Sequence, residues 1–396
     1  MREVAKLLEA KVSGLAGRPG AVHVVFESDL NVFWGMNGSG KTSFLKILHS
    51  ALTGHTGIIA RVPFRSAEVT FEQQGRTITR SVRKAFRQSD LTVDEQEFWE
   101  YMEQEKVSEE EKRAFLAEIT RKLQWTTAPD AKVDRSFPHG YLPISRMTDL
   151  AHSSYRHGVP PREATGLLNE TLIDEEFARQ TTALWRDYSN TALIRIRQAQ
   201  EQGLAEVLSA ILSGERSRSR SRAVIPSDIA YGLVTSFFKG QRISPQLASQ
   251  DKFSENYERN TLLQDVVTRI AEVEHSITVA QEPQQRLMEM FAELFPQNKS
   301  LMLDPRQGVG VKIGDERIPL ESLSSGEKQI VRLLLECLAA RSNAIIIDEP
   351  ELSLHVDWQH RLVSFMHLIN PDAQLILATH SPEVMANVAN EKVFEL

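Results

Sequence analysis

The sequence predicts an α/β protein in which two β-rich segments are separated by a long, mainly helical segment. Short β-rich runs such as "AVHVVFE" and "LNVFWG" occupy residues 1–82, and helix-forming residues dominate residues 83–295. Runs such as "AIIIDE" and "QLILATH" then return in residues 296–396. We therefore expect the two outer segments to form one domain with a mixed sheet, and the middle segment to be an insertion.

The composition is that of an ordinary globular protein. Of the 396 residues, 41% are hydrophobic and 25% are charged, which is typical of a chain with a substantial core. The formal net charge of −7 means that a contact with nucleic acid would depend on local basic patches. The single cysteine, Cys337, lies in an apolar run and is expected in the core. With neither a signal peptide nor an apolar run of about 18 residues, we expect a cytoplasmic protein without membrane contact.

Each element of the N-terminal segment follows from a local pattern. The run "LNVFWG" predicts a strand that leads into the glycine-rich loop "GMNGSGKT" at residues 35–42, and "KTSFLKILHSAL" predicts the helix that follows. The residues of "AEVTFEQQGRTITRSV" alternate around the turn "QQGR", which predicts a β-hairpin.

Two long helices are predicted in the middle segment, over residues 176–212 and 261–291. Their apolar residues recur at steps of three and four, as on one face of a helix. A helix of about 33 residues is about 50 Å long. The two helices therefore form either an antiparallel arm or an ordinary helical subdomain.

The sequence contains three charged runs. The stripe from Arg76 to Arg87 is basic and includes Arg80, Arg83 and Lys84; residues 94–111 contain nine acidic residues and one lysine; and "GERSRSRSR", between the two long helices, alternates arginine with serine. All three are expected on solvated surfaces. The two basic runs are also candidates for contact with a DNA backbone, and the stripe is a candidate for contact with an acidic partner.

The C-terminal segment is expected to return to the sheet of the N-terminal segment. The runs "LMLDP" and "GVGVKIG" precede an apolar helix after Leu323, and the strands "AIIIDE" and "QLILATH" follow it. The run "YLPISR" at residues 141–146 is a further candidate strand end, with Arg146 as a candidate phosphate or interface contact.

The loop "GMNGSGKT" fits the pattern G-x-x-x-x-G-K-[ST] between a predicted strand and a predicted helix. In such a loop, backbone N–H groups and the positive end of the helix cradle phosphate groups. Lys41 is expected to reach the β- and γ-phosphates, and Thr42 to ligate Mg²⁺. The candidate nucleotide-binding residues are Gly35, Asn37, Gly38, Ser39, Gly40, Lys41, Thr42 and Ser43.

The strand "AIIIDEP" delivers two adjacent carboxylates at its end. Because successive strand residues point to opposite faces, Asp348 and Glu349 are expected to have different roles. One holds the Mg²⁺ shell and the other activates or orients an attacking water; we assign Asp348 to the metal and Glu349 to the water. His380 ends the next strand and is expected beside the γ-phosphate, with a purely structural histidine as the alternative.

The ordered set "GMNGSGKT", "LSSGEKQ", "IIIDEP", "ELSLH" and "ATHSP" resembles the motifs of ABC-type ATPase heads. It is most similar to the soluble branch, which includes RecF, the structural-maintenance-of-chromosomes proteins and the overcoming-lysogenization-defect ATPases of bacterial phage defence. The resemblance implies a P-loop NTPase fold, ATP and Mg²⁺ as ligands, and hydrolysis of ATP.

The resemblance also implies that two copies of the chain share each nucleotide. In ABC-type heads, the signature loop of one subunit, here "LSSGEKQ", closes over the phosphate-binding (Walker A) loop of another, here "GMNGSGKT". The signature residues are therefore candidate ATP contacts in trans: Ser324, Ser325, Gly326 and Glu327. A helix that begins on small residues offers free N–H donors to phosphate, which fits this role. The candidate D-loop residues are Ser353 and His355, and His355 stands where the family has an aspartate.

Together these patterns predict an ATPase whose ATP-driven dimerisation controls DNA or a separate effector protein, in phage defence or DNA repair. A homodimer or higher homo-oligomer is expected, with a separately encoded nuclease or toxin as effector because little chain follows His380. An ATP-gated scaffold that sequesters such an effector and hydrolyses little ATP is the alternative. A transporter subunit fits poorly, because the helical segment between Thr42 and Leu323 is much longer than in such subunits.

Overall fold

A computed structural model describes most of the chain. The described residues are 5–73, 75–84, 123–128, 137, 139–143, 166–213, 225–240, 249–295, 299–304, 308–340 and 343–396. They divide into a head unit of Met1–Leu184, Met290–Leu303 and Val309–Leu396 and a helical unit of Trp185–Glu289 and Asp304–Gly308. Arg87, Arg146, the acidic run at residues 94–111 and the arginines of residues 216–222 lie outside the described residues.

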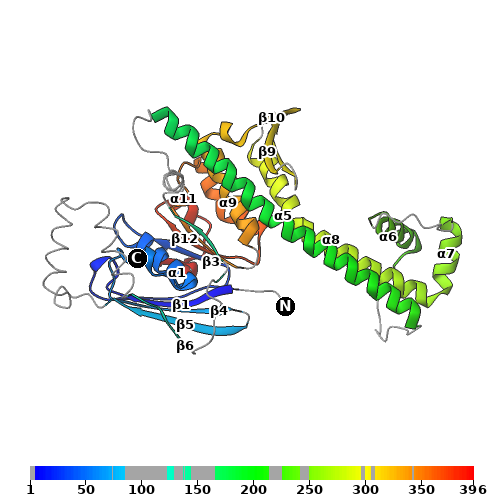
Figure 1. The fold of residues 1–396 in the computed structure, drawn as a ribbon, viewed down its shortest axis with the longest axis horizontal. Coiled ribbons are helices and arrows are strands. Elements are labelled where there is room, and N and C mark those ends of the chain that lie inside the picture. Colours follow the sequence, from blue (N-terminus) through cyan, green and yellow to red (C-terminus); the bar gives the residue numbers. More distant parts are fainter. Residues whose placement is uncertain are drawn as a thin grey trace. The chain divides into compact units, whose positions relative to one another are not determined.

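The head unit contains a five-stranded parallel sheet that combines both ends of the chain (Figure 1). Its strand order is β13-β3-β12-β11-β7, and every neighbouring pair is parallel. The strands are β3 (Leu30–Trp34), β7 (Gly140–Leu142), β11 (Ala344–Asp348), β12 (Gln374–Thr379) and β13 (Val393–Glu395). Since the strands are parallel, the loops that follow β3, β11 and β12 leave the sheet at one edge.

A second sheet of the head unit is antiparallel. Its strand order is β2-β1-β4-β5-β6. The strands are β1 (Ala5–Ser13), β2 (Ala21–Val25), β4 (Ser66–Gln73), β5 (Arg76–Arg83) and β6 (Thr126–Ala128). β4 and β5 form the predicted hairpin. The strands that were expected in one mixed sheet region are thus divided between two sheets.

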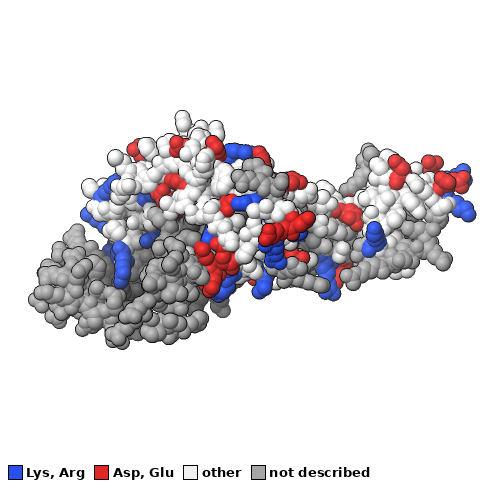
Figure 2. Space-filling view, turned by 90° about the horizontal axis from the view of Figure 1, so that it is seen from above, with Lys and Arg blue, Asp and Glu red and all other residues white. Residues whose placement is uncertain are grey.

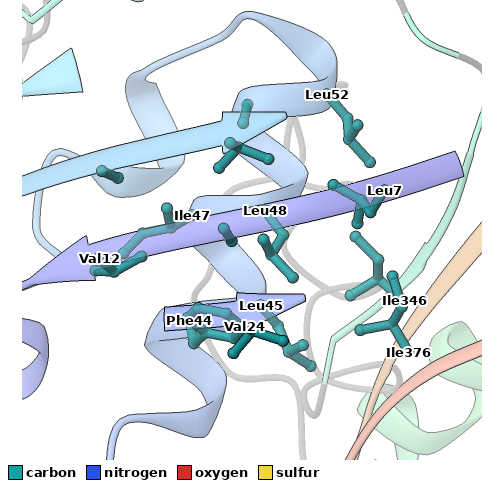
Figure 3. Close-up of a cluster of buried hydrophobic side chains, with 14 of the residues drawn as sticks. Leu7, Val12, Val24, Phe44, Leu45, Ile47, Leu48, Leu52, Ile346 and Ile376 are labelled. Atoms are coloured by element: carbon teal, nitrogen blue, oxygen red, sulfur yellow. The ribbon is translucent and has the colours of Figure 1, made fainter. Parts of the chain in front are cut away.

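Helix α1 (Lys41–Thr53) lies between these two sheets (Figure 3). Its buried side chains are Phe44, Leu45, Ile47, Leu48, Ala51 and Leu52. They share one core with Leu7, Val12 and Val24 from the antiparallel sheet and with Ile346 and Ile376 from the parallel sheet. A helix that is apolar on several sides is stable only when it is covered on several sides. This burial fixes the start of α1, and with it Lys41, at the edge where β3 ends.

Two further helices complete the head unit. α9 (Ser325–Ala340) packs on β11 and on α10 (Val356–Ile369). Cys337 of α9 is fully buried, as predicted, and its thiol donates to Met366 O at 3.1 Å. A small sheet of order β10-β9-β8 precedes α9. Its strands and the remaining short elements are β8 (Lys299–Asp304), β9 (Gly308–Ile313), β10 (Glu316–Ile318), α11 (Pro382–Met385) and the 3₁₀ helices Leu15–Gly17, Gly57–Ile59, Leu320–Ser322 and Asn390–Lys392.

The helical unit is built around both predicted long helices. α5 (Gly166–Ser213) and α8 (Thr261–Leu294) each belong partly to the head unit and partly to this unit. Within the helical unit they lie side by side in opposite chain directions (Figure 1), and Val207 packs with Ile270 and Val273. α6 (Ser227–Gly240) and α7 (Gln250–Arg259) contribute to the same apolar core. Of the helices within the described ranges, none is both long and apolar enough to cross a membrane.

Arg80 belongs to the basic stripe but has a structural role. It is 5% exposed, and its Nη1 donates to the carbonyl oxygens of Ala51 and Leu52 at the C-terminal end of α1. The last carbonyls of a helix lack partners within the helix and carry partial negative charge, so a buried guanidinium satisfies them well. The predicted contact between Arg80 and DNA is therefore wrong.

Lys84 is a second structural residue in this stripe. Its Nζ donates to Ala60 O and Val62 O, each at 2.7 Å, and burial lowers its pKa to about 8. A DNA contact is wrong for Lys84 as well, whereas Arg76 and Arg83 are exposed. On the face shown in Figure 2, acidic and basic side chains of the described residues are interspersed.

Candidate active site

The glycine-rich loop at residues 35–40 leads directly into the N-terminus of α1. Gly40 has φ 103°, in the left-handed region that favours glycine, and a Cβ there would lie 3.1 Å from Leu15 Cγ. The Ser39 hydroxyl is buried and has no hydrogen-bond partner in the part of the chain that the structure describes. The first turn of α1 adds backbone N–H groups that lack helical partners. Donors without acceptors at a helix start fit the oxygens of a phosphate group.

Lys41 brings a positive charge to this loop. The residue is 5% exposed, and its Nζ donates to Gly35 O at 2.9 Å and lies 2.7 Å from His380 Nε2. Burial lowers the pKa of Lys41, and the three carboxylates within residues 348–351 oppose this shift. The ammonium group is therefore held at the strand edge, within electrostatic reach of the carboxylates that follow β11.

Asp348 and Glu349 follow one another at the end of β11 but have different surroundings. Asp348 is fully buried. Glu349 has φ 49°, which is strained for a residue other than glycine, and its N–H donates to Ala378 O at 2.8 Å. Its Oε1 lies 3.1 Å from His380 Nε2. Strained backbone of this kind gathers at functional sites, where it directs a side chain that regular strand geometry would point elsewhere.

Burial and charge shift two pKa values at this edge. Burial raises the pKa of Glu349 to about 8, and the neighbouring carboxyl groups of Glu351 and Asp348 add to the increase. Burial and the Lys41 ammonium lower the pKa of His380. These shifts favour the neutral imidazole of His380, as an acceptor for Lys41, and the protonated form of Glu349.

Thr42 and Asp348 fit the predicted Mg²⁺ in their chemistry. A hydroxyl and a carboxylate are oxygen donors of the kind that Mg²⁺ prefers, with phosphate oxygens and water completing its shell. Thr42 is the second residue of α1, and the fully buried Asp348 carboxylate acts electrostatically on Lys41. Of the predicted residues, the structure thus brings Lys41, Asp348, Glu349 and His380 together.

Sequence reasoning does not single out Glu351, which belongs to the same cluster. Its Oε1 accepts hydrogen bonds from Thr379 Oγ1 at 2.6 Å, His380 N at 2.8 Å and Ser381 N at 3.1 Å. The available signal is a third carboxylate two positions after Glu349, at the junction of "IIIDEP" and "ELSLH". Alternation along a strand says nothing about it, because Glu351 lies in the turn after β11.

The signature loop starts α9 with a capping box. Ser324 Oγ accepts from Glu327 N at 3.3 Å, and Glu327 Oε2 accepts from Ser324 N at 2.9 Å. Glu327 Oε1 also lies 2.6 Å from Lys299 Nζ. The Glu327 carboxylate is thus engaged at the start of its own helix and paired with Lys299, and its contact with ATP stays a prediction. Ser324 and Ser325 are exposed.

Gly326 is in contact with the candidate D-loop of its own chain. A Cβ on Gly326 would lie 2.6 Å from Ser353 O, so only glycine fits there. Ser353 has φ 65°. The His355 ring caps α10, because its Nδ1 accepts from Asp357 N at 3.4 Å. The signature loop and the turn after β11 are thus packed against each other within one chain.

A cavity of about 460 Å³ lies beside the start of α1. Ser43 and Lys46 of α1 line it, together with Ile58, Arg61 and Pro63 from the segment that follows the helix. Ser43 is a predicted nucleotide-binding residue, so the cavity adjoins the candidate phosphate loop. Its mixture of apolar and cationic groups suits the nucleoside end of a nucleotide.

Comparison with known families agrees with this geometry. Residues 20–152 match the family described as "AAA domain", and residues 249–386 match the family described as "AAA domain, putative AbiEii toxin, Type IV TA system". The first match contains the phosphate loop, and the second contains the signature loop, β11 and His380. The chain contains an ABC-type ATPase head.

Part of the chain is similar to the protein named "Retron Vc95 probable ATPase" from Vibrio cholerae serotype O1 biovar El Tor. The two are 33% identical over 96 residues, which cover 21% of this chain and 18% of that protein. The match thus spans under a fifth of the relative's length.

The chain is also similar to solved structures of Smc head domains. One is an Smc head domain from Pyrococcus furiosus, with an extended coiled coil, bound to the C-terminal domain of ScpA. It is 15% identical to this chain, the TM-score is 0.43, and the match covers 97% of this chain and 92% of that chain. Another, with a coiled coil and joint, derives from Pyrococcus yayanosii; it is 16% identical, with a TM-score of 0.40 over 99% of this chain and 95% of that chain. These likenesses are weak, and the ATPase head is identified by its strand order, its loops and the family matches.

Proposed function

We propose that this protein binds ATP with Mg²⁺, hydrolyses it, and uses the ATP state to control DNA or a separate effector protein. One observation carries the proposal: Lys41 Nζ lies 2.7 Å, and Glu349 Oε1 3.1 Å, from the same atom, His380 Nε2. A cation for the phosphates, a carboxylate for the attacking water and an imidazole beside them are the groups that ATP hydrolysis requires.

The surroundings of each residue suggest its role. Lys41 exchanges its contacts with Gly35 O and His380 for the β- and γ-phosphate oxygens, which releases His380 toward the γ-phosphate. Glu349, once ionised, accepts a hydrogen bond from the attacking water and orients it. Thr42 and Asp348 would hold Mg²⁺, which neutralises charge on the phosphate oxygens. The nucleoside end of ATP enters the cavity lined by Ser43 and Arg61.

A second copy of the chain completes the site in this proposal. Ser324 and Ser325 are exposed at the N-terminus of α9, where free N–H groups and the helix dipole favour an anion. The capping box at Glu327 presents this helix start in a fixed conformation. The signature loop of one copy therefore closes over the ATP of another, and ATP joins the two heads.

In this proposal, a movement of α9 that depends on ATP is transmitted to the helical unit through α5. Lys328 of α9 pairs with Asp174 of α5 at 2.6 Å, and Lys328 is 5% exposed. Breaking the pair would leave the buried Lys328 ammonium without this counter-ion, so in this proposal α5 follows α9 when the signature loop moves. α5 continues as one helix from the head unit into the helical unit. This makes the helical unit the candidate surface for DNA or an effector.

Two of the similarities support a role in phage defence. Residues 249–386 match a family whose description names a toxin–antitoxin system, and the partial relative is named as a retron ATPase. Both favour a setting in phage defence. In our proposal the effector is a separately encoded nuclease or toxin, with DNA repair as a second setting. The exposed Arg76 and Arg83 are the remaining described candidates from the basic stripe for contact with DNA.

One observation favours the alternative of an ATP-gated scaffold with little hydrolysis. Burial and the neighbouring carboxyl groups raise the pKa of Glu349, which favours the protonated form and disfavours the carboxylate that would activate water. Slow turnover would keep ATP bound and the heads joined for longer. Such a protein would sequester its effector instead of cycling.

Steady-state phosphate release separates these proposals. We expect ATP- and Mg²⁺-dependent release by the wild-type protein and a loss of at least about 100-fold in Lys41→Ala, because the loop then lacks its phosphate-binding cation. ATP binding without release would favour the scaffold. Equal release by wild type and Lys41→Ala would refute the ATP site itself.

A further inference from the structure

Glu351 makes contacts that the roles assigned above do not use. A single oxygen, Oε1, accepts from the Thr379 hydroxyl at 2.6 Å and from the backbone N–H groups of His380 and Ser381 at 2.8 and 3.1 Å. All three donors belong to the segment that leaves β12, whereas Glu351 belongs to the turn that leaves β11. The carboxylate therefore joins the two loops that carry Glu349 and His380.

These hydrogen bonds restrain the backbone of His380 itself. Two successive N–H groups past the end of a strand have no ladder partner and need another acceptor. A carboxylate supplies charge-assisted bonds, which are roughly twice as strong as bonds between neutral groups. Because Glu351 accepts from the N–H groups of His380 and Ser381, the His380 backbone is fixed. The Nε2 atom of its ring then lies 2.7 Å from Lys41 Nζ and 3.1 Å from Glu349 Oε1.

The turn that carries Glu351 is held by contacts with α10 and with the signature loop. Gln359 of α10 donates to Leu354 O at 2.9 Å, and its Oε1 accepts from Ser381 Oγ at 2.8 Å. On the other side, Ser353 O packs against Gly326 of the signature loop. A displacement of the signature loop therefore reaches His380 through a short, continuous set of contacts.

We propose that Glu351 is a positioning residue that holds the backbone of His380 and thereby aims its imidazole into the ATP site, coupling the site to the signature loop of the same chain. This inference rests on the proposed function for its consequence in catalysis. Its structural part, the orientation of His380, stands on the hydrogen bonds alone.

The first test is a double-mutant cycle on ATP turnover with Glu351→Ala and His380→Ala. A misplacement of about 1 Å can lower a rate about 100-fold, so we expect Glu351→Ala to lower kcat by about 10- to 100-fold and to change KM for ATP by less than about threefold. At about pH 9, where Glu349 is mainly ionised with or without Glu351, the same change in the His380→Ala background should lower kcat by less than about threefold, because Glu351 then acts through His380. Full additivity of the two losses would overturn the proposal.

Two variants separate positioning from a general loss of structure. Glu351→Gln keeps an acceptor oxygen for the backbone N–H groups, so it should recover part of the kcat that Glu351→Ala loses. Glu383→Gln is the matched control. Glu383 Oε2 accepts from Ser381 Oγ at 2.9 Å, whereas the backbone N–H groups of His380 and Ser381 donate to Glu351. The kcat of Glu383→Gln should therefore stay within about twofold of wild type. A loss in Glu383→Gln equal to that in Glu351→Ala would contradict a specific role for Glu351.

A second readout does not depend on turnover. The imidazole resonance of His380, assigned by its disappearance in His380→Ala, should shift in Glu351→Ala and stay in place in Glu383→Gln. An unchanged resonance in folded Glu351→Ala would overturn the inference whether or not the protein hydrolyses ATP. Absence of turnover in the wild type, with a shifted resonance in Glu351→Ala, would instead refute the proposed hydrolysis and keep the positioning role.

Discussion

Replacing Arg80 by methionine removes the guanidinium at the end of α1 and keeps the aliphatic stem. Arg80 Nη1 donates to Leu52 O at 3.1 Å and to Ala51 O, and its guanidinium carbon lies 5.5 Å from the centroid of the Phe71 ring. Hydrogen bonds to a charged group contribute about 1.5–3 kcal/mol each, and a cation–π contact about 0.5–2 kcal/mol. Because these contacts share one desolvated guanidinium, we expect a loss of about 3–4 kcal/mol in the free energy of unfolding.

Urea denaturation followed by circular dichroism measures this loss. Arg76→Met is the matched control, because Arg76 lies on the same strand and is exposed; its free energy of unfolding should stay within about 0.5 kcal/mol of wild type. DNA binding by folded Arg80→Met should match wild type. A loss of stability below about 1 kcal/mol, or a selective loss of DNA binding in Arg80→Met, would refute the structural role of Arg80.

Three further predictions follow from individual contacts. The pKa of Glu349 is raised to about 8 and the carboxylate is needed in ionised form, so kcat/KM for ATP should rise from pH 6, be half-maximal at about pH 8 and level off above about pH 9; a flat profile would exclude Glu349 as the titrating group. The Nδ1 atom of His49 lies 2.7 Å from Nε2 of His139, and burial lowers the pKa of His49 from 6.5 to about 4. The unfolded chain therefore binds more protons between these pH values, so stability should fall as pH drops from about 6.5 to about 4, and His49→Gln should reduce this dependence; an unchanged dependence would refute it. Glu327→Ala removes the capping box and the Lys299 ion pair, so urea denaturation should show a loss of about 1–2 kcal/mol; an unchanged midpoint would mean that neither contact stabilises α9.

The glycine-rich loop between β3 and α1 could be predicted from the sequence because it is local. Glycine spacing, the following lysine and the flanking strand and helix all lie within residues 30–53, so neighbouring residues determine their arrangement. The hairpin of β4 and β5 is local in the same sense. The approach of Glu349 to His380 could also be expected, since adjacent parallel strands end at one edge of a sheet.

The remaining features depend on contacts between distant residues. Arg80 and Lys84 look like a surface stripe in sequence. Only the fold buries Arg80 against the end of α1 and brings the half-buried Lys84 to the carbonyls of the loop that follows this helix. Glu351 lies in a turn without periodicity, so its bonds to residues 379–381 have no sequence pattern. Gly326 has the family's spacing, but its closest neighbour is Ser353 O of its own chain, which sequence alone does not indicate.

Light scattering of the Glu349→Gln variant with ATP and Mg²⁺ tests most directly whether two chains share each ATP. The change keeps the size of the side chain and removes the carboxylate, so ATP should bind and persist. We predict an ATP-dependent rise above the chain mass of 44.7 kDa to at least twice that value, reversed by adding Ser324→Arg, which blocks the approach of the signature loop. Hydrolysis by Glu349→Gln at the wild-type rate, or ATP-dependent association that survives Ser324→Arg, would contradict the shared site.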